Sequence, residues 1–298
     1  MFPLEMASDE LRVETVPALM YHDVVPAGAE DSSGFLGRDA ALYKIAPDMF
    51  DAHLAAITSR LDARDRRYRF RRSNVPCGPA AMAAEPAAMA DPHAAAITFD
   101  DGGVSALVAA DMLERHGMLG HFFVTVNYLG TPGFLAERDV RDLRKRRHTI
   151  GSHSCSHPLR MGHCLWTQLL DEWTRSRAVL ADVLGEEVTA ASVPGGDFSP
   201  AVAEAAAAAG YTELFTSEPV LASRDAYGLT MHGRFIIRRW TTPATAAALA
   251  AGDWLACARQ RFLWNAKKIG KHLGGRRYLQ LRQLILGHGN EVRWGDQP

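Results

Sequence analysis

Three observations predict that this chain folds as an α/β barrel built on a parallel sheet. Apolar stretches with strand character alternate with amphipathic helical stretches from residue 96 to residue 216. Such alternation is typical of strand–helix–strand units with right-handed crossovers and parallel strands. Polar side chains also gather just after the predicted strands, where (β/α) barrels place their active sites. The chain has 298 residues, 47% of them hydrophobic, and is long enough to bury such a core.

The N-terminal part predicts one strand and one helix before the regular alternation begins. Residues 16–22 are apolar and end on His22, which predicts a short buried strand. Residues 23–44 are rich in glycine, serine and acidic side chains, and we expect them to be irregular. A helix is expected to begin at Pro47 or the residue after it, because both favour a helix N-terminus. A basic run followed by an Ala/Pro/Met-rich stretch predicts an irregular insertion near residues 60–93.

The later elements follow from hydrophobic spacing and from glycine and proline positions. Val104, Leu107, Val108 and Met112 have the i, i+3, i+4, i+8 spacing of a helix face. We expect one catalytic domain over residues 1–298, with a basic helical extension near residues 244–298. Strands are expected at residues 96–99, 121–126, 148–153, 189–193, 213–216 and 234–237, and helices at 104–116, 137–147, 166–184 and 200–210.

Two motifs on different predicted strands carry the chemistry. Residues 96–103 read as a strand that ends on Asp100 and Asp101 before a glycine turn. Residues 151–158 present His153 and His157, four positions apart, between turn-forming residues. One carboxylate and two imidazoles can hold a metal and leave a position open for water, while the other carboxylate takes a proton. This is the minimum equipment for metal-assisted hydrolysis.

A simpler interpretation exists for each motif taken alone. An Asp-Asp-Gly sequence is often only a turn, and two histidines four apart are often solvated. Their occurrence together on alternating strands and helices favours a metal site. A second zinc set is conceivable, but its ligands are too closely bunched for an ordinary structural zinc site, so we interpret Cys155 as a packed small residue. That set would consist of Cys155, His157, His163 and Cys164.

The motifs resemble those of a known family. Residues 98–102, Thr-Phe-Asp-Asp-Gly, and residues 153–158, His-Ser-Cys-Ser-His-Pro, resemble the first two motifs of the polysaccharide deacetylases, the NodB-homology group. Residues 19–22, Leu-Met-Tyr-His, resemble the N-terminal strand of the branch that acts on extracellular glycans. The resemblance covers about residues 16–240.

The resemblance implies a fold, an activity and residue roles. It implies a distorted (β/α) barrel that removes acetyl groups from N-acetylated sugars with one divalent metal ion, for which zinc is expected. Carried over by position, Asp100 would be the general base, and the metal ligands would be Asp101, His153 and His157.

The third family motif is altered here. Family members commonly carry an arginine, then prolines and an aromatic residue; Ser192 stands in place of the arginine and Gly195 in place of the aromatic. The turn of Pro194, Gly195 and Gly196 can still offer a backbone N–H to an oxyanion. The arginine that would brace the base must come from elsewhere. We expect Arg234, with Arg238 and Arg239 as alternatives and a solvated charge cluster as the simpler interpretation.

The general acid has three candidates. A histidine suits protonation of a departing amine, because its pKa lies near neutrality. The family's late histidine motif is matched only loosely, by His288. His232 precedes the last predicted strand, and His22 lies at the carboxyl end of the first. We expect His22, with a structural, hydrogen-bonded histidine as the alternative.

Composition limits location and partners. The formal net charge of −1 gives no reason to expect a nucleic-acid partner. Residues 1–15 are acidic and lack the features of a signal peptide, and the four cysteines show no disulfide spacing, so we expect a cytoplasmic protein. Residues 259–282 mix basic and apolar side chains. This segment is typical of an amphipathic helix on an anionic membrane or a biosynthetic partner, and also of a solvated helix face.

These observations lead to a metal-dependent deacetylase that acts on the N-acetyl group of an amino sugar in a glycan or a glycan precursor. Two rivals stay open. The same metal core would also hydrolyse another amide or acyl group, because the altered third motif changes the sugar-contacting surface. The chain would alternatively be a non-catalytic barrel that binds glycan or scaffolds a glycan-assembly complex.

Overall fold

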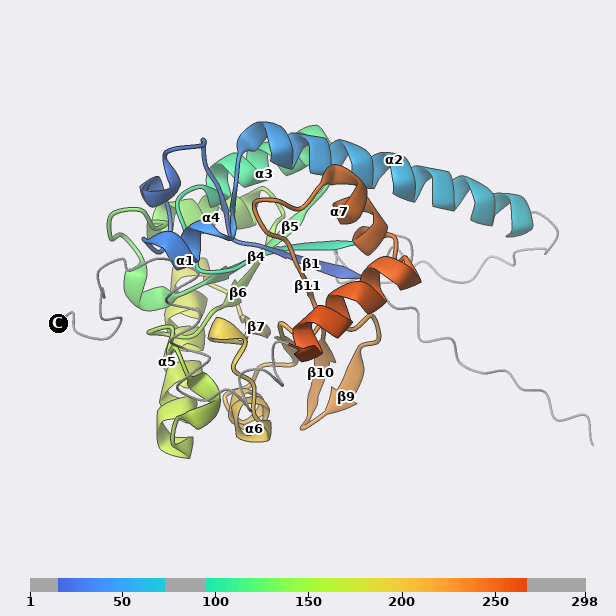
Figure 1. The fold of residues 1–298 in the computed structure, drawn as a ribbon. Helices are drawn as coiled ribbons and strands as arrows, with labels where there is room; N and C mark the ends of the chain where they lie inside the picture. Colours follow the sequence, from blue (N-terminus) through green and yellow to red (C-terminus); the bar gives the residue numbers. More distant parts are fainter. Residues whose placement is uncertain (1–15, 73–94, 267–298) are drawn as a thin grey trace, which may run out of the picture.

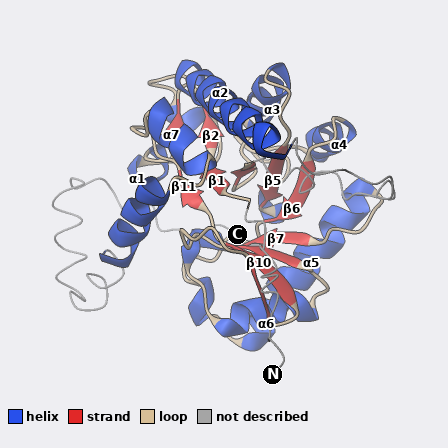
Figure 2. Ribbon diagram, turned by 90° about the vertical axis from the view of Figure 1, so that its right-hand side faces the viewer, coloured by secondary structure: helices blue, strands red, loops and turns tan. Residues whose placement is uncertain are grey.

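The fold is a curled, mostly parallel sheet wrapped by helices. The computed structural model describes residues 16–72 and 95–266, with the backbone alone over residues 63–72. The main sheet has nine strands in the order β11-β1-β4-β5-β6-β7-β8-β10-β9. Figure 2 shows these strands along an arc with helices outside it. The sheet thus forms a distorted half-barrel, and the predicted fold class is confirmed.

The strands are short and almost entirely buried, which explains their continuous apolar runs. All neighbouring pairs in the main sheet are parallel except β9 with β10. The strands are β1 (Ala18–Tyr21), β4 (Ala96–Phe99), β5 (Gly120–Val124), β6 (Thr149–Ser152), β7 (Ala190–Ser192), β8 (Glu213–Phe215), β9 (Arg224–Ala226), β10 (Leu229–His232) and β11 (Phe235–Ile236).

Helices follow most of the strands and cover the outer face of the sheet (Figure 1). Their buried side chains form one core with the strands, including Leu113, Trp173 and Leu180. The α-helices are α1 (Arg38–Ala41), α2 (Pro47–Arg72), α3 (Ala106–Arg115), α4 (Glu137–Lys145), α5 (Trp166–Leu184), α6 (Pro200–Ala208) and α7 (Pro243–Ala250). The short 3-10 helices are η1 (Glu30–Ser32), η2 (Val126–Tyr128), η3 (Met161–His163) and η4 (Pro194–Gly196).

Two parts of the chain are more regular than their sequence predicts. The segment 23–44, expected to be irregular, begins with β2 (Asp23–Val24) and runs through η1 and α1 into β3 (Lys44–Ile45), which pairs with β2. Residues 224–232 form the hairpin of β9 and β10, which we did not predict. Its turn places both Tyr227 and Gly228 at positive φ, and β9 is exposed and polar, so hydrophobic alternation gives no signal there.

Helix α2 continues through Arg72, so the first part of the insertion predicted near residues 60–93 is helical. No glycine or proline interrupts the sequence between Pro47 and Arg72, and arginine and alanine are good helix formers. The rest of that insertion lies outside the described residues.

The first part of the predicted C-terminal extension, near residues 244–298, lies in the described residues. Helix α7 packs against α2 and β1, and Ala246, Leu249 and Ala250 are buried there. Residues 254–266 are also helical, and residues 267–298 lie outside the described part. Within the described ranges, no helix combines the length and apolar character needed to cross a bilayer.

Candidate active site

The two neighbouring carboxylates follow β4 and point in different directions. Asp100 is the first residue after β4 and donates its backbone N–H to the Tyr21 carbonyl at 3.1 Å. Asp101 has a φ of +77°, in the left-handed region that residues other than glycine rarely adopt. This turn separates the two side chains, both of which are buried. Backbone strain of this kind is typically found at functional sites.

Asp101 lies against both histidines of the second motif. Its Oδ1 is 3.4 Å from His153 Nε2 and 3.5 Å from His157 Nε2. Within the described residues these three side chains form the one group whose ligand atoms converge as a metal requires, all within 4.8 Å of one another. Neighbouring ligand atoms of a tetrahedral zinc site with bonds of about 2.0–2.1 Å are about 3.3–3.4 Å apart. The residues present therefore fit a metal ion.

The surroundings of His157 favour its neutral, ligating form. Burial lowers the pKa of His157 to about 4, and the positive charge of His153 acts in the same direction, although Asp101 opposes it. His153 Nδ1 lies 3.1 Å from the Ser192 carbonyl, to which it can donate a hydrogen bond. That bond would leave Nε2 free for the metal, as is usual for ligating histidines.

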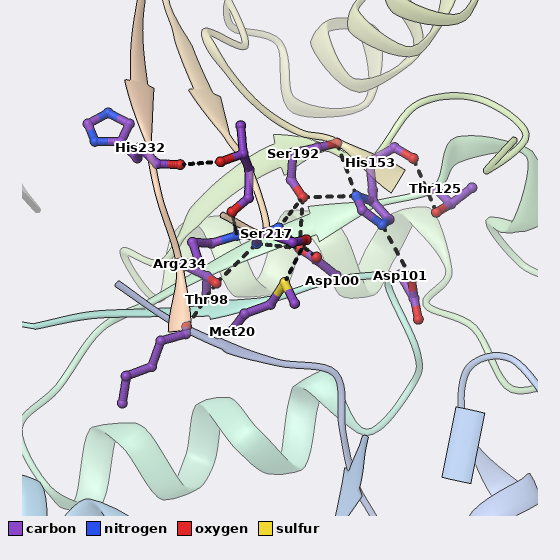
Figure 3. A network of polar contacts seen from close by, with 12 residues as sticks. Met20, Thr98, Asp100, Asp101, Thr125, His153, Ser192, Ser217, His232 and Arg234 are labelled. Carbon is purple, nitrogen blue, oxygen red and sulfur yellow. Dashed lines mark hydrogen bonds and ion pairs between the residues drawn. The ribbon is translucent and has the colours of Figure 1, made fainter. Parts of the chain in front are cut away.

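Asp100 is held by a fully buried arginine (Figure 3). Arg234 Nη1 donates to Asp100 Oδ1 at 2.7 Å, and Nη2 donates to Oδ2 at 2.8 Å. The Ser192 hydroxyl donates to Asp100 Oδ1 at 2.9 Å and accepts from Arg234 Nη2 at 2.9 Å. Arg234 also donates to Thr98 Oγ1 and to the Thr216 carbonyl. The arginine expected from the later strand thus reaches the carboxylate.

Charge outweighs burial at both carboxylates. Burial raises the pKa of Asp100, but the charges of Arg234 and His153 lower it by more, so the pKa lies below its usual value. The pKa of Asp101 is likewise lowered: burial raises it, but the neighbouring His153, His22 and His157 lower it by more. Both groups are carboxylates at neutral pH.

The other two candidate arginines lie elsewhere. The guanidinium carbon of Arg238 is 5.9 Å from the centre of the Trp240 ring. Arg239 lies 3.5 Å from the Glu30 carboxylate. Neither arrangement involves Asp100.

His22 and His232 are the two candidates for the general acid that lie in the described part of the chain. The charge of His22 acts on Asp100 and Asp101. Its Nδ1 is buried and has no hydrogen-bond partner among the described residues. His232 instead stacks on Phe215, with ring centres 4.6 Å apart, and its Nδ1 lies 2.9 Å from the Ser223 hydroxyl. His288 lies outside the described residues.

The altered third motif forms a tight turn after β7. Pro194 begins η4, and Gly195 and Gly196 have φ values of +61° and +65°. A β-carbon on Gly196 would lie 3.1 Å from Ser217, and one on Gly195 would lie 3.3 Å from the Leu159 carbonyl. Glycine is therefore required here for backbone conformation as well as for space.

The cysteine-containing alternative has no geometric support in the described part of the chain. Convergent ligand atoms there do not include Cys155 or Cys164. Burial, followed by the negative charge of Glu172, raises the pKa of the Cys155 thiol to about 12. The described cysteines, Cys155, Cys164 and Cys257, are all free thiols.

Sequence reasoning missed four side chains around the site. For Ser192, the one signal in the sequence is that it replaces the arginine of the third family motif. Phe35 and Tyr43 come from the segment expected to be irregular, and their rings lie 4.8 Å from those of His157 and His22, respectively. Glu172 binds the histidine loop from α5, and a glutamate on a predicted amphipathic helix gave no signal.

Comparisons with known proteins agree with this geometry. The sequence model of the family described as Polysaccharide deacetylase matches residues 88–214. A Bacillus subtilis protein, YxkH, whose curated name places it with the polysaccharide deacetylases, is 28% identical over 137 residues. That alignment covers 46% of this chain and 49% of the relative, so it spans about half of each protein.

Two solved structures share the fold. The Streptococcus pyogenes deacetylase PplD, in complex with acetate, superposes with a TM-score of 0.57 at 20% identity, covering 80% of this chain and 97% of that one. IcaB from Ammonifex degensii gives a TM-score of 0.58 at 19% identity, with the same coverage. Over residues 88–214, the chain is thus similar to the polysaccharide deacetylase family.

Proposed function

We propose that this protein is a metal-dependent hydrolase that removes the acetyl group from an N-acetylated amino sugar in a glycan or glycan precursor. The observation that carries the proposal is one carboxylate and two histidines that converge beside a second, arginine-held carboxylate. A hydrolase acting on amide bonds also fits the family.

The convergent group, Asp101, His153 and His157, would hold one divalent ion. We propose zinc, because two imidazoles and one carboxylate form a donor set that zinc commonly accepts. When bound, the metal would polarise the acetamide carbonyl and lower the pKa of water toward neutrality.

Asp100 would act as the general base. Its Oδ1 accepts hydrogen bonds from both Ser192 and Arg234, whereas Oδ2 accepts one from Arg234 alone. Oδ2 therefore keeps a lone pair for the proton of the attacking water. In this scheme Arg234 and Ser192 hold the carboxylate in one orientation, so that little reorganisation is needed when the proton moves.

Two further groups complete the proposed reaction. The turn of Pro194, Gly195 and Gly196 would offer backbone N–H groups to the oxyanion of the tetrahedral intermediate. His22 would give a proton to the departing amine, a role supported by its buried Nδ1, which has no partner among the described residues, and by the action of its charge on both carboxylates.

Acetate release tests this proposal. Metal-free protein is incubated with N-acetylated sugars, oligosaccharides and lipid-linked precursors, with zinc, cobalt or no metal added back. The proposal predicts metal-dependent release from at least one amino-sugar substrate. Release only from other amides or acyl groups would favour the wider hydrolase hypothesis. Metal uptake and tight glycan binding without any release would favour the scaffold hypothesis.

Contact of the C-terminal segment with an anionic membrane or a biosynthetic partner stays a prediction, as does a cytoplasmic location. Exposed Trp254, Leu255 and Phe262 lie beside Arg259 and Arg261 on the described part of that segment. Apolar side chains interspersed with arginines are typical of helices that lie on anionic lipid. Sedimentation with phosphatidylglycerol vesicles, but not with neutral phosphatidylcholine vesicles, is the expected result.

A further inference from the structure

The loop that carries both histidines has an unfavourable backbone conformation. Ser154 and His157 have φ values of +65° and +56°, in the left-handed region that side chains disfavour. Such a conformation persists only where surrounding contacts determine it. Within the loop, the Ser152 hydroxyl accepts from the Ser154 N–H at 3.0 Å, and the Ser154 hydroxyl accepts from the His157 N–H at 3.1 Å.

One carboxylate outside the loop holds its centre. Glu172, on α5, accepts the backbone N–H of Cys155 at 2.8 Å and that of Ser156 at 2.9 Å through Oε2. Its Oε1 accepts the Ser156 hydroxyl at 2.6 Å. Both carboxylate oxygens thus accept hydrogen bonds from the two residues that lie midway between the histidines. Hydrogen bonds to an ionised acceptor are stronger than neutral ones, so this contact is suited to fixing a loop.

The helix that carries Glu172 is itself firmly anchored. Trp173, the next residue, is fully buried and donates its indole N–H to the Val202 carbonyl at 3.1 Å. Ser176, one turn later, is also fully buried, and its hydroxyl contacts that of Ser152 at 2.7 Å. The Glu172 carboxylate therefore projects from a rigid element onto the histidine loop.

We propose that Glu172 is a positioning residue that sets the metal affinity of the Asp101–His153–His157 centre by holding the loop between the two histidines. This inference rests on the proposed metal site. Without Glu172, two backbone N–H groups lose their acceptor, and the loop is free to leave the left-handed conformation that points both imidazoles at Asp101. Metal binding would then have to order the loop again, and the free energy that this costs would weaken the metal affinity.

Zinc affinity of the full-length protein tests the proposal. Metal-free wild type, Glu172→Gln, Glu172→Ala and Ser156→Ala compete for zinc with a chromogenic chelator. Changes to groups that orient metal ligands typically weaken metal affinity by about 10–100-fold. We expect about tenfold weakening for Glu172→Gln, which keeps the shape but loses the charge, and about 100-fold for Glu172→Ala. Ser156→Ala loses one of the three bonds and should show the smallest effect.

Two controls separate positioning from general stability. Asp171→Asn removes the neighbouring carboxylate, which is exposed and bonded to Arg175, and should leave the zinc affinity within twofold of wild type. Thermal unfolding of the metal-free proteins reports any defect of the fold itself. A glutamate that only stabilised the fold would lower the unfolding temperature without changing the zinc affinity of the folded protein.

The outcomes distinguish this inference from the proposed function. Zinc affinities of both Glu172 variants equal to that of wild type would overturn the positioning role and leave the metal centre standing. If Glu172→Ala fails to fold, the zinc affinity of Glu172→Gln alone decides whether Glu172 has the positioning role. A wild type that binds no more zinc than His153→Ala would overturn the metal centre, and this inference with it. The absorption spectrum of bound cobalt should also change in Glu172→Gln, because the ligand geometry is altered.

Discussion

Asp100 and Asp101 are neighbours in the sequence but have different surroundings. Alternation along a strand predicts that successive side chains point to opposite faces. In the structure the strand has already ended, and the left-handed φ of Asp101 turns its carboxylate toward the histidines. Asp100 stays with Arg234. The separation of the two carboxylates could be predicted, but the conformation that produces it could not.

The arginine that holds Asp100 provides the first prediction. Arg234→Lys keeps the charge but cannot make two parallel hydrogen bonds to the carboxylate. Positioned general-base catalysis typically contributes about 10²–10⁴-fold to a rate. We therefore expect kcat for acetate release to fall by about 10²-fold, while zinc affinity changes little. Arg238→Lys, which alters the arginine over Trp240, is the matched control and should behave as wild type. Equal kcat values for both variants would remove Arg234 from the mechanism.

A buried histidine inside the barrel predicts a pH effect on stability. Burial, with the nearby positive charges of His232, His148 and Arg234, lowers the pKa of His121 to about 4. The unfolded chain binds a proton at His121 near the model-peptide pKa of about 6.5, so stability is complete above that pH and is lost as pH falls toward 4. The loss attributable to His121 is about 3 kcal/mol.

Urea unfolding at pH 7 and pH 4 measures this effect. His121→Asn has no titrating group there, so its stability should fall less between the two pH values than that of wild type. His163→Asn, which alters an exposed histidine, is the control. The same pH dependence in wild type and His121→Asn would show that His121 titrates normally in the folded state.

The segment between β2 and β3 lies along one side of the site. Phe35 packs against His157, and Tyr43 packs against His22. A buried ion pair holds this segment: Lys44 Nζ is 3.6 Å from Asp23 Oδ2 and donates to the Glu30 and Phe35 carbonyls. Asp23 and Lys44 are polar and lie twenty-one positions apart in the sequence, so their pairing gives no periodic signal. This explains why the segment was expected to be irregular.

The ion pair gives a prediction on stability. Lys44→Met leaves the buried Asp23 carboxylate without its cation, and removing one partner of a buried pair costs about 3–5 kcal/mol. Urea unfolding should show this loss, and the double variant Asp23→Asn/Lys44→Met should recover part of it. Asp253→Asn breaks the exposed pair with Arg60 and should cost at most about 1 kcal/mol. If Lys44→Met lowered the free energy of unfolding no more than Asp253→Asn does, the ion pair would not hold this segment.

Most helices and parallel strands could be predicted because their hydrophobic spacing is strong. Helix α5 begins and ends at the residues expected, Trp166 and Leu184, and Gly185 adopts the left-handed conformation that ends it. The β9–β10 hairpin and the length of α2 could not be predicted from spacing. Strand β9 is polar, and the arginine-rich second half of α2 lacks the apolar spacing that predicts a helix.

At the scale of the whole molecule, strand order decides which residues meet. β11 pairs with β1 at one end of the sheet, and β10 lies near the other end, although the two strands are close in sequence. Arg234 lies between them and reaches Thr216, Thr98 and Asp100 across the curled sheet. The sequence identified the histidines and carboxylates by motif. It left Arg238 and Arg239 as alternatives to Arg234, because that choice depends on how the sheet closes.

The central claim is that the metal is held by Asp101, His153 and His157, while Asp100 moves the proton. Single-turnover acetate release by wild type and Asp100→Asn at equal, measured zinc occupancy, with the substrate found by acetate release, tests it most directly. The account predicts that Asp100→Asn binds zinc as wild type does and releases acetate about 10²–10⁴-fold more slowly. His153→Ala should lose both zinc and activity. Acetate release by zinc-loaded Asp100→Asn at the wild-type rate would contradict the account.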